Sequence, residues 1–125
     1  MEDWHAHVDR AQARYADGES RLPDEADARQ RQLTRMGNAA AAAGIASLMA
    51  GDRAAAADWL DRAATRYRES WPDAPPGSWG RPIGAMKARI LAGDWDGAAE
   101  DARWALDAGA GGAESPIGRY AAALA

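Results

Sequence analysis

The sequence contains no cysteine among its 125 residues, and it contains no phenylalanine either. Without cysteine, disulfide bonds, thiolate catalysis and cysteine-ligated metal sites are excluded. Lysine is nearly absent as well: Lys87 is the only lysine among 15 basic residues. Acidic residues outnumber the basic ones, 19 to 15. The net charge of −4 gives no overall attraction to nucleic acids or anionic membranes, and a cytoplasmic location is expected.

Long apolar segments are also missing. The longest apolar run covers residues 39–50, twelve residues, whereas a membrane-spanning helix needs about 20. The N-terminal ten residues are charged and lack the apolar core of a secretory signal. We therefore expect no membrane insertion, and the length suits one domain with a modest core.

Nearly the whole chain is predicted to be helical, because alanine and arginine are strong helix formers and no stretch alternates between apolar and polar residues. The apolar spacing and the turn signals predict helices at about 3–16, 23–50, 53–70, 81–92, 95–108 and 115–125. Asp17-Gly18 is expected to stop the first helix, and Pro23 is expected in the first turn of the second. The apolar spacing continues across Gly37, so one long second helix is predicted, with a kink at Gly37 as the alternative.

Two internal similarities indicate a repeat. Ala50-Gly51-Asp52 recurs 42 residues later as Ala92-Gly93-Asp94. Separately, Pro82-Ile83-Gly84 recurs 34 residues later as Pro116-Ile117-Gly118. Thirty-four residues is the period of tetratricopeptide (TPR) helix pairs, in which a short turn joins two helices.

The first predicted pair resembles the TPR pattern at five positions. The pattern has one glycine in the first helix and another in the turn. The second helix then carries an alanine, a bulky apolar residue and a second alanine. These positions are held by Gly44, Gly51, Ala56, Leu60 and Ala63. The second pair resembles it in the turn Gly93-Asp94-Trp95, followed by Ala98 and Ala105. It departs from the pattern at Met86, where a small residue is expected, and at Ala102, where a bulky one is expected. The resemblance implies an all-α fold of about six helices, in antiparallel hairpins stacked as a short right-handed superhelix.

The resemblance also divides this single domain. The expected parts are N-terminal helices at 1–36, a first repeat at 37–80, a second repeat at 81–112, and the first helix of an incomplete third repeat at 113–125. The first repeat includes an inserted loop at 71–80 that is rich in proline and tryptophan. Trp71 and Trp79 either plug the joint between repeats or are displayed for binding, and polyproline recognition is a minor third interpretation. We predict that Trp79 packs against the helix that begins near residue 81.

The sequence offers little for catalysis or metal binding. His5 and His7 project about 200° apart on a helix, so they cannot share one ion, and tetrahedral sites need three or four converging ligands. Most of the serines lie at predicted turns or caps, without the base and acid that a nucleophile needs. Paired carboxylates such as Glu100/Asp101 are expected to be ion-pair partners on solvated helix faces. We therefore expect no enzyme, no cofactor and no metal.

Arginines cluster in two short runs, one at residues 29–35 and the other at 62–68. Either run could contact phosphates. Acidic neighbours such as Asp27 and Asp58 instead indicate solvated faces of mixed charge. No nucleic-acid partner is therefore expected.

A TPR-like stack implies peptide binding along a concave face that the first helix of each pair lines. The expected partner-binding residues are Ala41, Ile45, Leu48, Trp79, Ile83, Lys87 and Ile90. Only Lys87 matches the chemistry with which some family members bind a terminal carboxylate, so a shallow and mainly apolar groove is expected. The alternative is that the groove residues simply pack between helices. The leading hypothesis is a non-catalytic module that binds a protein or peptide partner.

The C-terminal helix leads to a second hypothesis. Its apolar residues are Ile117, Tyr120, Ala121 and Leu124, and no polar capping helix follows them. We therefore expect either self-association, with a homodimer as the commonest solution, or a chain that is a fragment of a longer solenoid. These structural roles stay open beside the binding function, and an enzyme is a distant third.

Overall fold

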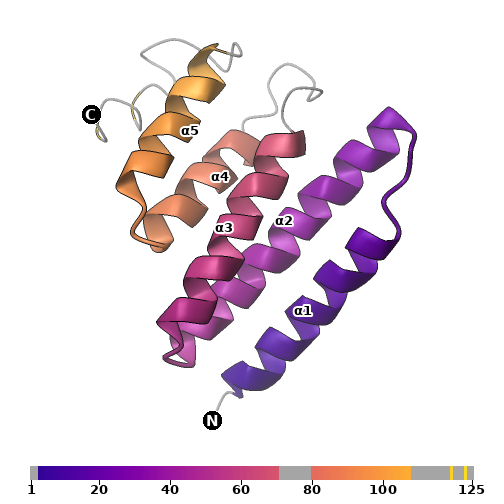
Figure 1. Ribbon diagram of the computed structural model, residues 1–125, viewed down its shortest axis with the longest axis vertical. Helices are drawn as coiled ribbons and strands as arrows, with labels where there is room; N and C mark the ends of the chain where they lie inside the picture. Colours follow the sequence, from indigo (N-terminus) through magenta and orange to yellow (C-terminus); the bar gives the residue numbers. More distant parts are fainter. Residues whose placement is uncertain (1–2, 71–79, 108–118, 120–122, 124–125) are drawn as a thin grey trace.

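The computed structural model describes residues 3–70 and 80–107, together with Arg119 and Ala123. This part of the chain is all-α and holds five helices, α1 (Trp4–Ser20), α2 (Ala26–Met49), α3 (Arg53–Ser70), α4 (Gly80–Leu91) and α5 (Trp95–Asp107). Consecutive helices run in opposite directions and pack mainly against their neighbours in sequence (Figure 1). Nearly all of the expected sixth helix, with its four self-association residues, and both tryptophans of the inserted loop lie outside the described residues.

Helix α1 continues through Gly18, so the prediction of a stop at Asp17-Gly18 is wrong. Gly18 is buried, and a Cβ atom at this position would lie 2.8 Å from Cγ of Met36 on α2. The glycine therefore allows α1 and α2 to approach closely. Gln32 of α2 also donates a hydrogen bond of 3.1 Å to the carbonyl oxygen of Gly18, and the helix ends at Ser20.

A carboxylate determines where α2 begins. The side chain of Glu25 accepts hydrogen bonds from the backbone N–H groups of Ala28 (2.7 Å) and Asp27 (3.0 Å), which the first helical turn would otherwise leave without acceptors. These two bonds lower the pKa of the Glu25 carboxyl below its ordinary value. The helix therefore begins at Ala26, and the prediction that Pro23 occupies its first turn is wrong.

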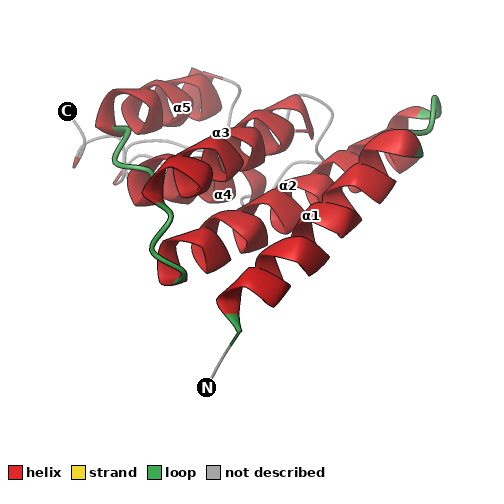
Figure 2. Ribbon diagram, turned by 60° about the horizontal axis from the view of Figure 1, so that its bottom comes forward, coloured by secondary structure: helices red, strands yellow, loops and turns green. Residues whose placement is uncertain are grey.

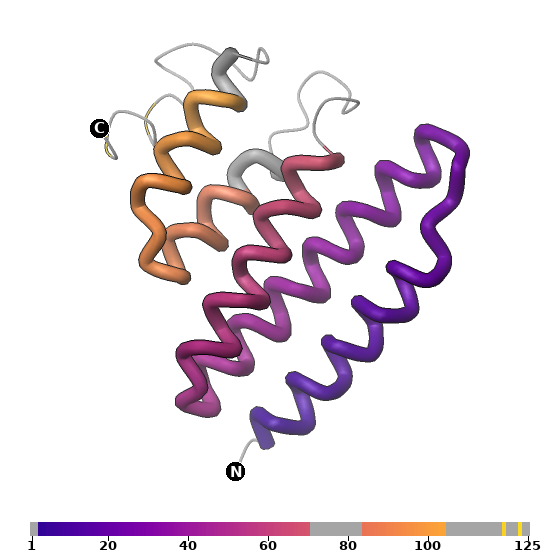
Figure 3. Tube along the Cα trace, viewed as in Figure 1, coloured from indigo at the N-terminus to yellow at the C-terminus, as the bar shows by residue number. Residues whose placement is uncertain are grey.

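Helix α2 is unbroken across Gly37, as predicted, and two of its glycines face α3. A Cβ atom on Gly37 would lie 2.7 Å from the ring of Tyr67, and one on Gly44 would lie 2.7 Å from Cγ of Leu60. Two large side chains of α3 therefore occupy the space that side chains at these two glycine positions of α2 would need. The expected boundary between residues 36 and 37 falls inside this helix, which packs on both α1 and α3 (Figure 3).

The two Gly-Asp turns have the same geometry. Gly51 and Gly93 adopt positive φ angles of 85° and 78°, a backbone conformation that glycine reaches without steric cost. Asp52 and Asp94 each accept a hydrogen bond from the backbone N–H three residues later, at 3.1 Å and 2.9 Å. Each aspartate thus caps the helix that follows it. The 42-residue similarity therefore corresponds to two equivalent turns, which lie on the same side of the helix stack (Figures 1 and 2).

Small residues dominate the core. Its buried apolar members are Ala11, Tyr15, Leu33, Met36, Ala40, Ala43, Ala46, Ala56, Trp59, Leu60, Ala63, Ala64, Tyr67, Ala85, Met86, Ala88, Ala98 and Ala102. Met86 and Ala102 occupy the positions that match Gly44 and Leu60 at the 42-residue offset, and both are fully buried. At these matching positions the first hairpin therefore has a small residue on its first helix and a large one on its second, and the second hairpin has the reverse. Among the described residues, no helix combines the length and the apolar character needed to cross a membrane.

Candidate functional site

Large apolar side chains are exposed next to the two Gly-Asp turns. Ile45 (46% exposed), Met49 (57%), Leu91 (48%) and Trp95 (57%) lie at the C-terminal ends of α2 and α4 and at the start of α5. We call these four residues, together with Leu48 and Ile90, the turn-end surface. Because exposed large apolar side chains that gather in a patch mark interaction sites, and these lie near the same two turns, the turn-end surface is the first candidate site.

A cavity connects the α2 and α4 parts of the turn-end surface. It has a volume of about 330 Å³ and is bounded by α2, α3, α4 and the second Gly-Asp turn. Its lining residues are Leu48, Arg53, Ala56, Ala57, Leu60, Ile90, Leu91, Ala92 and Gly93. Since Leu48 and Leu91 line the same cavity, α2 and α4 present their apolar ends to one common recess.

The structure brings together part of the predicted groove. Leu48 and Ile90 line the cavity, and Ile45 is exposed beside it on α2. Ala41 is half-buried and packs against the core, which matches the alternative of plain helix packing, and Lys87 is exposed on α4. Two other expected partner-binding residues, at positions 79 and 83, have side chains outside the described residues.

Three residues of the turn-end surface were missed by the sequence analysis. Met49 and Leu91 occupy matching positions at the 42-residue offset, just before the Ala-Gly-Asp segments. This match could have indicated an apolar surface, because the helix pattern alone does not account for a bulky apolar residue at the end of both helices. The sequence links Trp95 only to the turn motif, because its exposure depends on how α5 packs.

The two arginine runs have different surroundings. In the run at 62–68, Arg62 stacks over the ring of Trp59, with its guanidinium carbon 4.5 Å from the ring centre. Arg66 donates a hydrogen bond of 3.0 Å to the Tyr15 hydroxyl and forms an ion pair of 2.9 Å with Glu19. Arg66 therefore holds α3 to α1, whereas Arg62 packs on its own helix. The run at 29–35 lies on α2, and its arginines are exposed.

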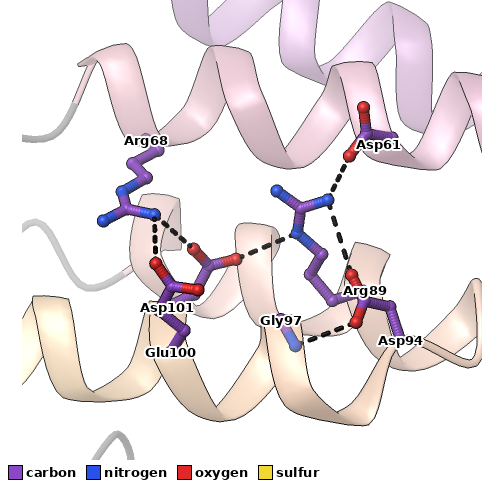
Figure 4. Close-up of polar contacts among 7 residues, drawn as sticks. All are labelled: Asp61, Arg68, Arg89, Asp94, Gly97, Glu100 and Asp101. Atoms are coloured by element: carbon purple, nitrogen blue, oxygen red, sulfur yellow. Dashed lines mark hydrogen bonds and ion pairs between the residues drawn. The ribbon is translucent and has the colours of Figure 1, made fainter.

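A buried carboxylate joins α3, α4 and α5. The Asp101 side chain, only 2% exposed, pairs with Arg89 Nε at 3.3 Å and with Arg68 Nη1 at 3.4 Å (Figure 4). Arg89 also pairs with Asp61 on α3 and, at 3.7 Å, with Asp94. Burial raises the pKa of Asp101 above its ordinary value, and the positive charge of Arg89 opposes this shift.

Glu100 and Asp101 are both ion-pair partners, as expected, but the expected solvated face is wrong for Asp101, because its side chain points between two helices. Both of its carboxylate oxygens are already engaged by arginine. The arrangement suits a structural link between helices, since neither oxygen is left open to a substrate.

The histidines lie on α1. His5 is exposed, and His7 is half-buried with its ring 5.4 Å from the ring of Trp4. Within residues 3–70 and 80–107, no group of three or more His, Asp or Glu side chains is arranged to hold a metal ion. Metal chemistry therefore supplies no candidate site in this part of the chain.

Comparison with protein-family models, with curated proteins and with solved structures found no match to this chain. The resemblance to TPR proteins thus rests on the sequence pattern and on the two equivalent turns.

Proposed function

We propose that the chain is a non-catalytic protein-interaction module that binds a segment of a partner protein at the turn-end surface. The observation that carries the proposal is the exposure of Ile45, Met49, Leu91 and Trp95 near the two Gly-Asp turns, together with a recess that Leu48 and Leu91 line in common. Burying such side chains against a partner removes apolar area from water, and tryptophan is enriched among residues that dominate binding energy.

The hairpin architecture supports this proposal. The first helices of the two expected pairs, α2 and α4, both contribute side chains to the recess, and a TPR-like stack is expected to bind peptides along the face that these first helices line. A peptide in the recess would contact Leu48 and Leu91 together, so it would bridge the two hairpins. The right-handed stacking of these hairpins is part of the proposal.

Selection from a displayed library of random dodecapeptides tests the proposed function. We expect wild-type protein to enrich peptides with two or more large apolar residues. The Met49→Ser/Leu91→Ser variant should weaken binding of those peptides by about tenfold or more, because each lost anchor costs about 1 kcal/mol. Both residues are exposed, so the helical circular dichroism signal should not change.

An Ala13→Ser variant is the control, because Ala13 is exposed on α1 and lies outside the turn-end surface. It should bind like wild type. No peptide enriched above the bare support, or enriched peptides that bind the double variant equally well, would refute the proposal. Light scattering on the same samples tests whether a second copy occupies the surface instead. In that case the molecular mass would rise with concentration, and the double substitution would abolish the rise.

A further inference from the structure

One exposed stripe of α2 changes chemistry along its length. Its members follow a spacing of four and three residues, which keeps them on one side of the helix. In order they are Arg31, Arg35, Asn38, Ala42, Ile45 and Met49, and all are exposed. The stripe is thus cationic and polar at its beginning, small in its middle, and apolar where it enters the turn-end surface.

The cationic half of the stripe borders a second cavity, between α1 and α2. This cavity has a volume of about 430 Å³, and Arg14 of α1 and Arg35 of α2 both line it. Among the described residues, neither arginine has a hydrogen bond or an ion pair. The cavity also includes one carboxylate, that of Asp17, but Asp17 pairs with Arg21 at 3.0 Å. Two guanidinium groups therefore share a recess without a counter-ion.

A neutral donor lies beside them. The side-chain oxygen of Asn38 accepts a hydrogen bond from the hydroxyl of Tyr67, which leaves the amide nitrogen of Asn38 to donate elsewhere. Asn38 lines the same cavity as Arg14 and Arg35. The recess thus combines two cations with an amide donor, which is a set of groups that suits a carboxylate.

We infer that the partner segment is an acidic-apolar peptide that lies along α2. Its apolar side chains occupy the turn-end surface, and an Asp or Glu carboxylate is held by Arg14 and Arg35. This inference rests on the proposed function and adds the chemistry of the partner to it. Charge complementarity selects the occupant, because a neutral or basic segment on the same path would leave both arginines unpaired or repelled.

The length of the stripe predicts the spacing within the peptide. Arg35 and Ile45 are ten residues apart on a helix that rises 1.5 Å per residue, so they are separated by about 15 Å along the axis. An extended peptide covers that distance in about four or five residues. The peptide should therefore carry its acidic residue four or five positions from its apolar anchor.

The test uses the dodecapeptide library on wild type and on an Arg35→Glu variant in parallel. Wild type should enrich peptides with an acidic residue at the predicted spacing. Fluorescence anisotropy with synthetic copies of these peptides should show about tenfold weaker binding when that residue is replaced by its amide. Arg14→Glu and Arg35→Glu should each give a similar loss, and Arg35→Glu should enrich lysine or arginine where wild type selects an acid.

Arg103→Glu is the matched control, because Arg103 is exposed on α5 and the substitution changes the net charge by the same amount. It should leave the affinity within about twofold of wild type. Enriched peptides that lack the acid and tolerate both Arg→Glu changes, but lose binding to Met49→Ser/Leu91→Ser, would overturn this inference and leave the proposed function intact. If the library yields no binder at all, the proposed function fails and the inference fails with it.

Discussion

Gly44→Ala should destabilise the wild-type protein but stabilise a variant in which Leu60 is replaced by alanine. In the wild-type core, the new Cβ atom would lie 2.7 Å from Cγ and 2.8 Å from Cδ2 of Leu60, which is closer than carbon atoms approach. Overpacking of this kind costs about 1–3 kcal/mol. The helix itself gains about 1 kcal/mol when alanine replaces glycine in its interior. We therefore expect Gly44→Ala to lower the free energy of unfolding by about 1 kcal/mol.

Leu60→Ala removes the atoms that obstruct the methyl group. Leu60 is fully buried, so this change alone should cost about 2–5 kcal/mol through lost contacts and a residual cavity. In that background, Gly44→Ala meets no obstacle and partly fills the cavity, so it should raise stability by about 1 kcal/mol. The two effects of the same methyl group then differ by about 2 kcal/mol, which is well within the range of coupling between residues in contact.

Urea denaturation of the four proteins, followed by circular dichroism, measures this coupling. Gly51→Ala provides the control in both backgrounds. No atom lies within 4 Å of a Cβ at Gly51, but its φ of +85° makes alanine unfavourable by about 1–2 kcal/mol whatever residue 60 is. Equal destabilisation by Gly44→Ala with and without Leu60 would show that the contact with Leu60 is not the reason for the glycine.

Three further changes test the described contacts. Ionised Glu25 stabilises the fold above its unfolded-state pKa, and this stabilisation is lost as pH falls through the lowered folded-state pKa, so Glu25→Ala should flatten the acid decline in urea midpoint. Asp101→Asn should lower the free energy of unfolding by about 2 kcal/mol because Arg89 and Arg68 lose a buried charged acceptor, although Arg89 keeps Asp61 and Asp94, whereas Asp58→Asn on an exposed face should change it by less than about 0.5 kcal/mol. Tyr15→Phe should cost about 1 kcal/mol in the same assay because Arg66 loses its hydroxyl acceptor.

Local signals were sufficient for much of the fold. The start of α3 follows from Gly51-Asp52 before it, and α2 stays helical across Gly37 because its apolar spacing stays in phase. The end of α1 could not be predicted in this way. In its local sequence Gly18 looks like a glycine that ends a helix. Its actual role is to make room for Met36, and Met36 lies near it only because α1 packs against α2.

The candidate sites show the same limit. Ile45 could be assigned to the candidate surface from its position on α2, and Met49 from its match at the 42-residue offset. Arg14 could not be joined to Arg35 from the sequence, because these residues share a cavity only after α1 folds back on α2. Asp101 resembles any exposed carboxylate in its local sequence, and its burial depends on the positions of α3 and α4.

Packing mainly between sequence neighbours has a consequence for how this molecule opens. A chain dominated by local contacts has low contact order, which favours rapid folding, and its segments can unfold in stages. Helix α5 depends on α4 and on the Asp101 ion pairs, whereas α2 has a helix on each side. Amide hydrogen exchange should therefore begin in α4 and α5 while α1–α3 stay protected. A ligand bound against both α2 and α4 would slow amide exchange in α4 and α5, because these helices could then unfold only after the ligand dissociates.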